Sequence, residues 1–544
     1  MPVVRIDLKR FPKMVGAERS KILERLPYVG LDIESVEKDS VRVEYSPNRP
    51  DFGTDFGIAR ALRGLMGKET GLPRFRTSKS GVAVSVDRRL SKIRPFIVCA
   101  TAGGLSLDEE DVRQLISLQE DLHNGLGRKR RTVAIGLHDM DKVAPPISYR
   151  AVPDSFRFVP LDGHKALSIS AILSDTKEGK AYGGYFSNGR YFPLIADSKG
   201  VVLSFPPIIN GNATKVTTKT SRMFIEVTGT NQRACDDVLA VITTTLAEMD
   251  GRIGTVTIKG PGKPRTTPDL RPIELPFDEG QVESVLGLGL SRRDMVSCLA
   301  RSRLGVKGGK VLGPRYRIDL LHPIDVAEEV ALGYGMDKIG PIYPPSKRPG
   351  KFNQFEEFLD SVSTTMAGSG MTELMTFELT DSKSLYTNFG RHPTAKISVE
   401  NPKSSEHSLL RDALVPGLMS SLSANIKSDY PQRVYEIGRV FERDEERVSE
   451  AWHLGSLVAH SQASFTEAKM YLVSACEILS GRKVLSTTDG YWAFSPGRCA
   501  AVQVDRVQIG HVGEIEPFVV DAFGLGVPVA GFEISLSKLF ELLK

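Results

Sequence analysis

The chain has 544 residues, of which 41% are hydrophobic and 25% are charged, and its formal net charge is +5. This composition is ordinary for a soluble globular protein of about three or four domains, and the mild positive charge permits nucleic-acid binding without arguing for it. The charged N-terminus excludes a signal peptide, and no apolar run approaches the roughly 18 residues of a membrane span. The five cysteines lie far apart, which excludes a disulfide framework and a cysteine-based zinc site. We therefore expect a soluble, cytoplasmic protein without membrane contact.

Two stretches rich in proline, glycine and basic residues look like linkers, Lys259–Pro268 and Pro341–Gly350, and a weaker break lies near Thr77–Gly81. These breaks predict four parts, over residues 1–80, 85–260, 268–344 and 350–544. Helical and strand patterns alternate in all of them, so the predicted class is a multidomain α+β protein.

The first two parts contain short patterns that predict individual elements. Alternation predicts strands at Val41–Tyr45 and Val133–Leu137, and apolar periodicity predicts helices at Thr54–Met66 and Leu115–Leu122. The basic cluster Gly127–Arg131 (GRKRR) precedes the second strand and could grip phosphates, although a solvated turn explains it equally well.

His138 and Asp139 end that strand and could form an acid/base pair, but a turn-forming aspartate is the simpler interpretation. Further on, Pro206, Pro207 and Asn210-Gly211 predict a turn before the strand Phe224–Thr228.

On the strand Phe224–Thr228, the side chains of Phe224, Glu226 and Thr228 share one face. A carboxylate and a hydroxyl on one face could hydrogen-bond a polar ligand. The alternative is an exposed strand face.

The third part begins with two predicted helices, Glu279–Leu286 and Arg292–Ser302, and Ser291 with Asp294 forms a capping box for the second. Such a helix–turn–helix pattern could read DNA. Basic residues on an exposed helix face are the alternative explanation for Arg292, Arg293 and Arg301.

Four acids follow within Tyr316–Tyr334. We expect Asp319 to end a strand, and the helix that follows to carry Asp325, Glu328 and Glu329 on one face of its first turn. Four hard oxygen ligands suit Mg²⁺. A capping box from Asp325 to Glu328 is the alternative, because acids are favoured at helix N-termini, and it leaves only Asp319 unexplained.

No P-loop, G-x-S-x-G, H-E-x-x-H or dinucleotide-binding motif is present. Taken in order, however, segments along nearly the whole chain resemble the phenylalanyl-tRNA synthetase beta-subunit family of the archaeal/eukaryotic type. The matching segments are Tyr45–Gly64, Gly127–Asp139, Phe192–Val216, Ile225–Thr230, Tyr316–Gly335, Glu400–Leu418, Arg433–Phe441 and Ser495–Pro517.

The resemblance implies an α₂β₂ heterotetramer that attaches phenylalanine to its tRNA with ATP and Mg²⁺, at a site on the alpha subunit. It assigns residues 85–260 to an editing module, 268–344 to a DNA-binding-like (winged-helix-like) module, and 350–544 to a class II synthetase-like antiparallel-sheet domain without an active site. The magnesium ligands map onto Asp319, Asp325, Glu328 and Glu329, in a site shared with the alpha subunit.

The implied editing reaction is the hydrolysis of tyrosine from mischarged phenylalanine tRNA. A phenylalanine pocket rejects an added hydroxyl poorly, so a second pocket that binds the hydroxyl removes the error. By the resemblance, Leu194, Ser204, Glu226 and Thr228 line that pocket. The chain departs from archaeal members at Glu226, where they usually carry aspartate, and no catalytic residue or general base can be named.

The last strand–helix turn of class II synthetases carries an arginine that holds ATP, but Phe523–Leu539 contains none. We therefore expect ATP and phenylalanine to bind only through the alpha subunit. Two alternatives remain at this point, namely a stand-alone tRNA- or DNA-binding adaptor and a synthetase subunit that has lost editing.

Overall fold

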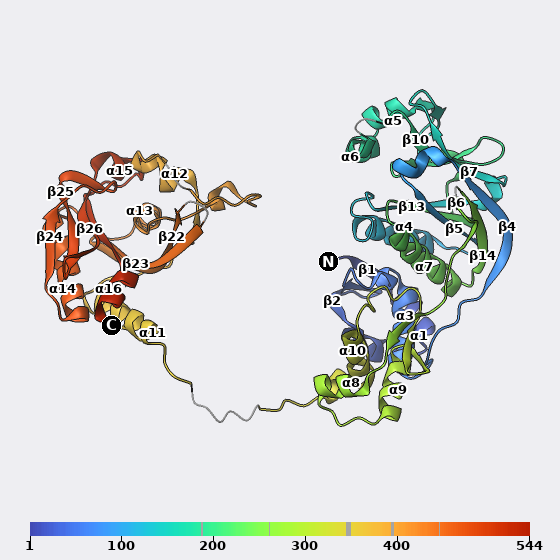
Figure 1. Cartoon of the computed structure of the whole chain (residues 1–544), viewed down its shortest axis with the longest axis horizontal. Coiled ribbons are helices and arrows are strands. Elements are labelled where there is room, and N and C mark those ends of the chain that lie inside the picture. The colour runs from blue at the N-terminus through green and yellow to red at the C-terminus, as the bar shows by residue number, and fades with distance from the viewer. Residues whose placement is uncertain (187–188, 261, 344–349, 393–395, 445–446) are drawn as a thin grey trace. The chain divides into compact units, whose positions relative to one another are not determined.

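The computed structural model describes residues 1–544 except 187–188, 261, 344–349, 393–395 and 445–446 (Figure 1). The chain divides into two units, Met1–Tyr343 and Pro344–Lys544. None of the helices among the described residues has the length and apolarity that crossing a membrane requires. The predicted linker Pro341–Gly350 falls mostly outside the described residues.

The N-terminal module is a three-stranded antiparallel sheet in the order β1-β3-β2, covered by short helices. The predicted strand and helix are confirmed as β3 and α3, and α3 begins after the extended residue Thr54 with Asp55 in its first turn. The elements are β1 (Val3–Asp7), α1 (Phe11–Val15), α2 (Arg19–Arg25), β2 (Leu31–Val36), β3 (Ser40–Tyr45) and α3 (Asp55–Leu65).

A ten-stranded sheet follows, with the path β12-β11-β10-β7-β4-β14-β5-β13-β6 and β15 paired to β14. Its strands pair antiparallel except for β4 with β14 and with β7. The strands are β4 (Thr77–Val86), β5 (Phe96–Gly103), β6 (Val133–Asp139), β7 (Ile147–Val152), β10 (Phe192–Ala196), β11 (Val202–Phe205), β12 (Ile209–Asn210), β13 (Arg222–Gly229), β14 (Arg252–Lys259) and β15 (Arg265–Thr267).

Helices α4 (Glu109–Asn124) and α7 (Gln232–Glu248) cover one face of this sheet (Figure 1), and their apolar side chains pack with Met223, Ile225 and Val227 of β13. Phe224 packs in a separate cluster, so the alternation predicted for β13 is confirmed. The sheet also curls, because β11 contacts β6 although they lie near opposite ends of the strand order. The curl brings β11, β13 and α4 around one cavity.

The predicted linker Lys259–Pro268 is partly wrong. Its residues Arg265–Thr267 form β15, and the buried hydroxyl of Thr267 bonds to the backbone of Cys99, donating to the carbonyl at 2.7 Å. Four small elements complete this module: β8 (Arg157–Phe158), β9 (Leu167–Ser168), α5 (Ile169–Asp175) and α6 (Lys177–Tyr182).

In the third module, α10 (Pro323–Tyr334) packs against both α8 (Glu279–Leu286) and α9 (Arg292–Arg301). The predicted capping box of Ser291 and Asp294 is confirmed at the start of α9. A three-stranded sheet in the order β16-β18-β17 accompanies the helices. Its strands are β16 (Ile273–Pro276), β17 (Gly305–Lys307) and β18 (Lys310–Gly313).

The second unit is built on a seven-stranded sheet, β19-β22-β23-β27-β26-β25-β24, antiparallel except for β19 with β22. The predicted α+β class and the antiparallel C-terminal sheet are therefore confirmed. The strands are β19 (Thr372–Glu373), β22 (Gln432–Asp444), β23 (Arg447–Ala459), β24 (Val484–Thr488), β25 (Phe494–Val504), β26 (Val507–Ile515) and β27 (Val529–Ser535), with a separate pair β20 (Leu379–Thr380) and β21 (Leu409–Leu410).

Two apolar clusters hold the helices of this unit to the sheet. One cluster includes residues of α11 (Gln354–Gly368), α14 (Phe465–Ser480) and α16 (Leu536–Leu543). The other includes residues of α13 (Val415–Ala424) and α15 (Pro517–Ala522), while α12 (Ser382–Leu385) lies next to α13.

Candidate functional site

A cavity of about 470 Å³ lies where the ten-stranded sheet curls. Apolar side chains from α4 and β6, including Leu115, Ala134 and Leu137, line it together with Ser204 of β11 and Glu226 of β13. The structure thus brings two of the four predicted pocket residues to one cavity, although β11 and β13 are far apart in the strand order.

Glu226 is the buried acid of this cavity, with 1% of its surface exposed. Its Oε1 accepts a hydrogen bond from the Ser204 hydroxyl at 2.8 Å. Its Oε2 accepts none from any described residue. Burying a polar atom without a partner costs free energy, so this oxygen is suited to accept a hydrogen bond from a bound group.

His138, at the end of β6, lies beside Glu226, with its Nε2 3.9 Å from Glu226 Oε1. The His138 ring is fully buried; its Nδ1 lies 2.9 Å from the Thr214 hydroxyl, and its Nε2 has no hydrogen-bond partner among the described residues. Asp139 is the turn-forming aspartate of the simpler interpretation, because its Oδ1 accepts a hydrogen bond from Asp141 N at 3.1 Å. The sequence did contain a signal, since residues 136 and 138 share a strand face.

Gly136 makes room for these two side chains. It lies directly opposite Glu226 in the register of β6 and β13. A Cβ atom at this position would lie 2.3 Å from Glu226 Oε1 and 2.6 Å from His138 Nε2. The glycine is therefore required by the close approach of the carboxylate and the imidazole.

Thr228 and Leu194 do not line the cavity. The Thr228 hydroxyl accepts a hydrogen bond from Arg94 Nε at 2.9 Å, which directs it to another partner. Ile195, not Leu194, lies opposite Ser204 in the register of β10 and β11. Leu194 packs in an apolar cluster with Phe205 and Ile208, which themselves line the cavity. Their predicted roles in the pocket stay predictions without a contact to support them.

Burial keeps two neighbouring groups uncharged. It lowers the pKa of His123 below its ordinary value, and Glu120 offsets part of this shift. His123 Nε2 accepts a hydrogen bond from Ile135 N at 2.9 Å, which requires an unprotonated nitrogen. Burial also raises the pKa of the Cys99 thiol well above its usual range, and the carboxyl of Glu226 adds to that rise.

The acidic segment differs from its prediction. Residues 316–319 form turns instead of a strand. The buried side chain of Arg317 binds Asp319 through three hydrogen bonds, the shortest at 2.6 Å, and also binds Glu329. Glu329 is therefore 4% exposed and lies on the buried face of α10, whereas Glu328 is exposed.

Asp325 stabilises the start of α10, but not as the predicted N-cap. His322 is the N-cap, and Asp325 Oδ2 accepts hydrogen bonds from Leu321 N and His322 N, both at 2.7 Å. Partial burial and the adjacent Glu329 raise the pKa of the Glu328 carboxyl above its ordinary value.

As the structure places them, these four carboxylates do not fit a magnesium site. Asp319 and Glu329 share Arg317, and Asp325 is engaged with backbone donors. Within the described part of the chain, no three acidic, histidine or cysteine side chains lie close enough to hold a metal ion. The metal ligands implied by the resemblance therefore stay a prediction, one that requires Asp319 and Glu329 to leave Arg317.

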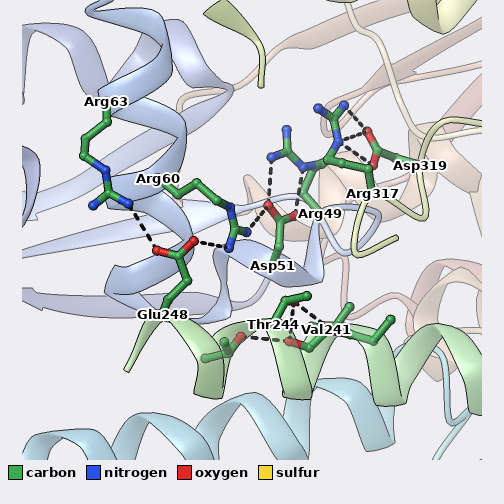
Figure 2. A network of polar contacts seen from close by, with 11 residues as sticks. Arg49, Asp51, Arg60, Arg63, Val241, Thr244, Glu248, Arg317 and Asp319 are labelled. Atoms are coloured by element: carbon green, nitrogen blue, oxygen red, sulfur yellow. Dashed lines mark hydrogen bonds and ion pairs between the residues drawn. The ribbon is translucent and has the colours of Figure 1, made fainter. Parts of the chain in front are cut away.

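A network of buried ion pairs links the N-terminal module to α7 (Figure 2). Asp51 lies between two arginines, accepting from Arg49 Nε and Nη2 at 2.9 Å and from Arg60 Nη2 at 3.2 Å. Glu248 of α7 then accepts from Arg60 at 3.4 Å and from Arg63 at 3.1 Å. The guanidinium of Arg60 also lies 3.7 Å from the centre of the Tyr316 ring, so the network reaches the acidic segment.

The segment Phe523–Leu539, which contains no arginine, carries a buried anion in the second unit. Glu533 of β27, 4% exposed, accepts hydrogen bonds from Leu414 N at 3.0 Å and Val415 N at 3.1 Å. The buried Arg411 is engaged with Thr376 at 2.8 Å and with Glu436 at 2.5 Å. Both charged groups are thus occupied within the fold.

Comparisons with known proteins match three segments of the chain and most of its length. Family models match residues 339–536 (phenylalanyl-tRNA synthetase beta chain CLM domain), 275–336 (tRNA synthetase B5 domain) and 109–239 (B3/4 domain). The chain is 38% identical to the phenylalanine–tRNA ligase beta subunit of Archaeoglobus fulgidus over 99% of both chains. It is 40% identical to that of Methanothrix thermoacetophila over 99% of this chain and 100% of the relative.

A solved structure of an N-terminal fragment supports the same family assignment. The crystal structure of an N-terminal fragment of the phenylalanyl-tRNA synthetase beta subunit from Pyrococcus horikoshii is 34% identical, with a TM-score of 0.59. It covers 61% of this chain and 100% of the fragment. Sequence similarity over the full length and this structural match together show that the chain belongs to the family of phenylalanyl-tRNA synthetase beta subunits.

Proposed function

We propose that the cavity beside Glu226 binds the side chain of tyrosine wrongly attached to phenylalanine tRNA, so that the chain hydrolyses the ester. The observation that carries this proposal is the buried Glu226 Oε2 at the cavity, which has no hydrogen-bond partner among the described residues. A tyrosine hydroxyl would donate to this oxygen. Phenylalanine would leave it unpaired, at a cost of about 1–3 kcal/mol.

Hydrolysis breaks the bond between the tyrosine carbonyl carbon and the ribose oxygen, and water supplies the new carboxylate oxygen. His138 is a positioning residue in this proposal, because its Nε2 lies 3.9 Å from Glu226 Oε1 and faces the same space. Ser204 fixes the other side of the carboxylate through its 2.8 Å hydrogen bond. The chain's contribution is therefore selection and orientation of the substrate.

The chain is a subunit of phenylalanine–tRNA ligase, an aminoacyl-tRNA synthetase, and this membership implies an alpha-subunit partner and tRNA. The full-length similarity does not favour the stand-alone nucleic-acid adaptor. We further propose the α₂β₂ assembly in the cytoplasm, with ATP and phenylalanine bound by the alpha subunit. The implied Mg²⁺ site at Asp319, Asp325, Glu328 and Glu329, which would brace the interface between the subunits, requires Asp319 and Glu329 to leave Arg317.

The test is the Glu226→Ala variant in complex with the alpha subunit. Loss of a hydrogen bond to a charged group, worth about 1.5–3 kcal/mol, should slow the release of tyrosine roughly tenfold to a hundredfold. Attachment of phenylalanine should be unchanged. Glu226→Gln is the matched variant, because it keeps the size of the side chain but removes its charge.

Equal rates of tyrosine release in wild type and Glu226→Ala would show that this carboxylate does not recognise the hydroxyl group of the tyrosine substrate. A parallel loss of phenylalanine attachment would instead indicate general damage to the fold.

A further inference from the structure

The loop between α4 and β6 contains the basic cluster Gly127–Arg131 and has an uncommon backbone. Arg128, Lys129 and Arg130 have φ angles of 47°, 56° and 66°. Three consecutive residues thus lie in the left-handed region, where a Cβ atom is crowded and glycine is favoured. Long basic side chains stand at positions where the backbone alone would favour glycine.

Contacts around the loop hold it in this conformation. Arg130 donates to the Ile208 carbonyl at 3.0 Å and to Glu120 Oε1 at 2.8 Å, and its guanidinium lies 4.8 Å from the centre of the Tyr182 ring. The Tyr185 hydroxyl donates to the carbonyl of Lys129 at 2.8 Å. Arg130 is therefore an anchor, and the neighbouring basic side chains are presented in a fixed arrangement.

The other three basic side chains of the loop are free. Arg128, Lys129 and Arg131 are exposed, and none of them makes an ion pair or a side-chain hydrogen bond with any residue that the structure describes. A structural turn would not need them, since no side-chain hydrogen bond or ion pair ties them to a described residue. Three positive charges therefore face solvent from a loop that is held in one conformation.

The position of the loop indicates what these charges bind. Arg130 lines the 470 Å³ cavity together with Glu226. Arg131 lines a second hollow of about 400 Å³, together with Arg94 and Tyr185, and Pro207 lines both spaces. The loop thus lies at the boundary between the cavity and a neighbouring hollow that carries two arginines and an aromatic ring.

We propose that Arg128, Lys129 and Arg131 bind the phosphodiester backbone of the single-stranded 3′ end of the charged tRNA. This inference rests on the proposed editing function, because the amino acid in the cavity is attached to that 3′ end. Clustered arginine and lysine side chains bind phosphates independently of the nucleotide sequence. They would therefore hold the 3′ end in place, while the cavity selects the attached amino acid. The Tyr185 ring beside them offers a surface on which a base can stack.

The first experiment compares the triple variant Arg128→Gln, Lys129→Gln, Arg131→Gln with wild type, each as the complex with the alpha subunit. Tyrosine release should show a KM at least tenfold higher with little change in kcat. The slope of log(kcat/KM) against log[KCl] should become shallower by about 2, since each phosphate contact to a single strand contributes about 0.7. The matched control, Lys13→Gln, Lys21→Gln, Lys38→Gln, removes three exposed charges from the N-terminal module and should behave as wild type.

A second experiment does not depend on hydrolysis. The full chain is titrated with a fluorescent RNA minihelix that carries an uncharged single-stranded 3′ end, and binding is followed by anisotropy. The triple variant should bind at least tenfold more weakly than wild type and the lysine control. If wild type released no tyrosine, the editing proposal would fail while this result could still stand.

A double variant, Arg128→Gly with Lys129→Gly, separates charge from folding, because glycine accepts the left-handed backbone. It should keep or raise the thermal midpoint while weakening minihelix binding. Unchanged minihelix affinity in the triple variant, or no binding by wild type at low salt, would overturn the inference.

Discussion

Glu226 and His138 lie so close to Gly136 that a Cβ atom at that position would displace the carboxylate or the imidazole. The carboxylate and the imidazole occupy the space opposite Gly136, and Ser204 holds the carboxylate from the other strand. The position of the Glu226 carboxylate in the pocket therefore requires a glycine at residue 136.

Gly136→Ala tests this directly. Its Cβ would lie 2.3 Å from Glu226 Oε1, so the carboxylate must move, and a misplacement of this size is expected to slow tyrosine release by roughly a hundredfold. The same change at Gly368, where nothing lies within 4 Å, is the control. The measurement is single-turnover hydrolysis of tyrosine-charged tRNA, and an unaltered rate in Gly136→Ala would place the reaction elsewhere.

The sequence predicts this site only in part, and the reason is physical. Strand alternation predicts that Glu226 shares a strand face with Phe224 and Thr228, and the resemblance adds Ser204 to the predicted pocket. Neither signal says which strands lie next to each other in the sheet. That His138 lies beside Glu226 depends on the pairing of β6 with β13, and that Ile195 instead of Leu194 lies opposite Ser204 depends on the register of β10 with β11. The register between strands that are distant in sequence cannot be predicted from the pattern of one short segment.

Among the elements, local capping and apolar periodicity are sufficient to predict α8 and α9, whereas the N-cap expected for α10 is wrong. The start of α9 at Ser291 and the limits of α8 follow from local chemistry, and the structure agrees with them. The expected strand before Asp319 is absent because Arg317 is buried between Asp319 and Glu329. A tertiary ion pair there overrides a local strand pattern.

The Arg317→Met variant tests this assignment of the acidic segment. Removing the cation leaves the buried Glu329 and the half-buried Asp319 without their partner, which should destabilise the first unit by about 3–5 kcal/mol. The freed carboxylates should then bind Mg²⁺, so millimolar MgCl₂ should raise the thermal midpoint of the variant more than that of wild type.

Lys310→Met removes an exposed ion pair with Glu274 in the same module, and it should show neither effect. Equal stabilisation of wild type and Arg317→Met by Mg²⁺ would contradict the view that Arg317 occupies the predicted ligands.

At the scale of the whole molecule, the first unit depends on charges buried between its modules. Burial alone would raise the pKa of Asp51, but Arg49 and Arg60 together hold it below its ordinary value. Asp51 and Arg60 are each 2% exposed, so the loss of either charge leaves its partner buried and unpaired.

Asp51→Asn should therefore lower the stability of the first unit by about 3–5 kcal/mol. The two tryptophans, Trp452 and Trp492, both lie in the second unit, so their fluorescence reports its unfolding separately. Circular dichroism in urea should show the transition of the first unit moved to lower urea, while the tryptophan transition is unchanged. A shift of both transitions, or of neither, would contradict a network confined to the first unit.

The most direct test of the account is the release of tyrosine and of phenylalanine from the same tRNA by the wild-type chain in complex with its alpha subunit. Tyrosine satisfies Glu226 Oε2 and phenylalanine does not, which predicts hydrolysis of the tyrosine ester that is roughly 5-fold to 150-fold faster in a single turnover, for a difference of about 1–3 kcal/mol. Equal rates for the two esters, or no release of tyrosine above the uncatalysed rate, would contradict the account and identify a beta subunit that has lost editing.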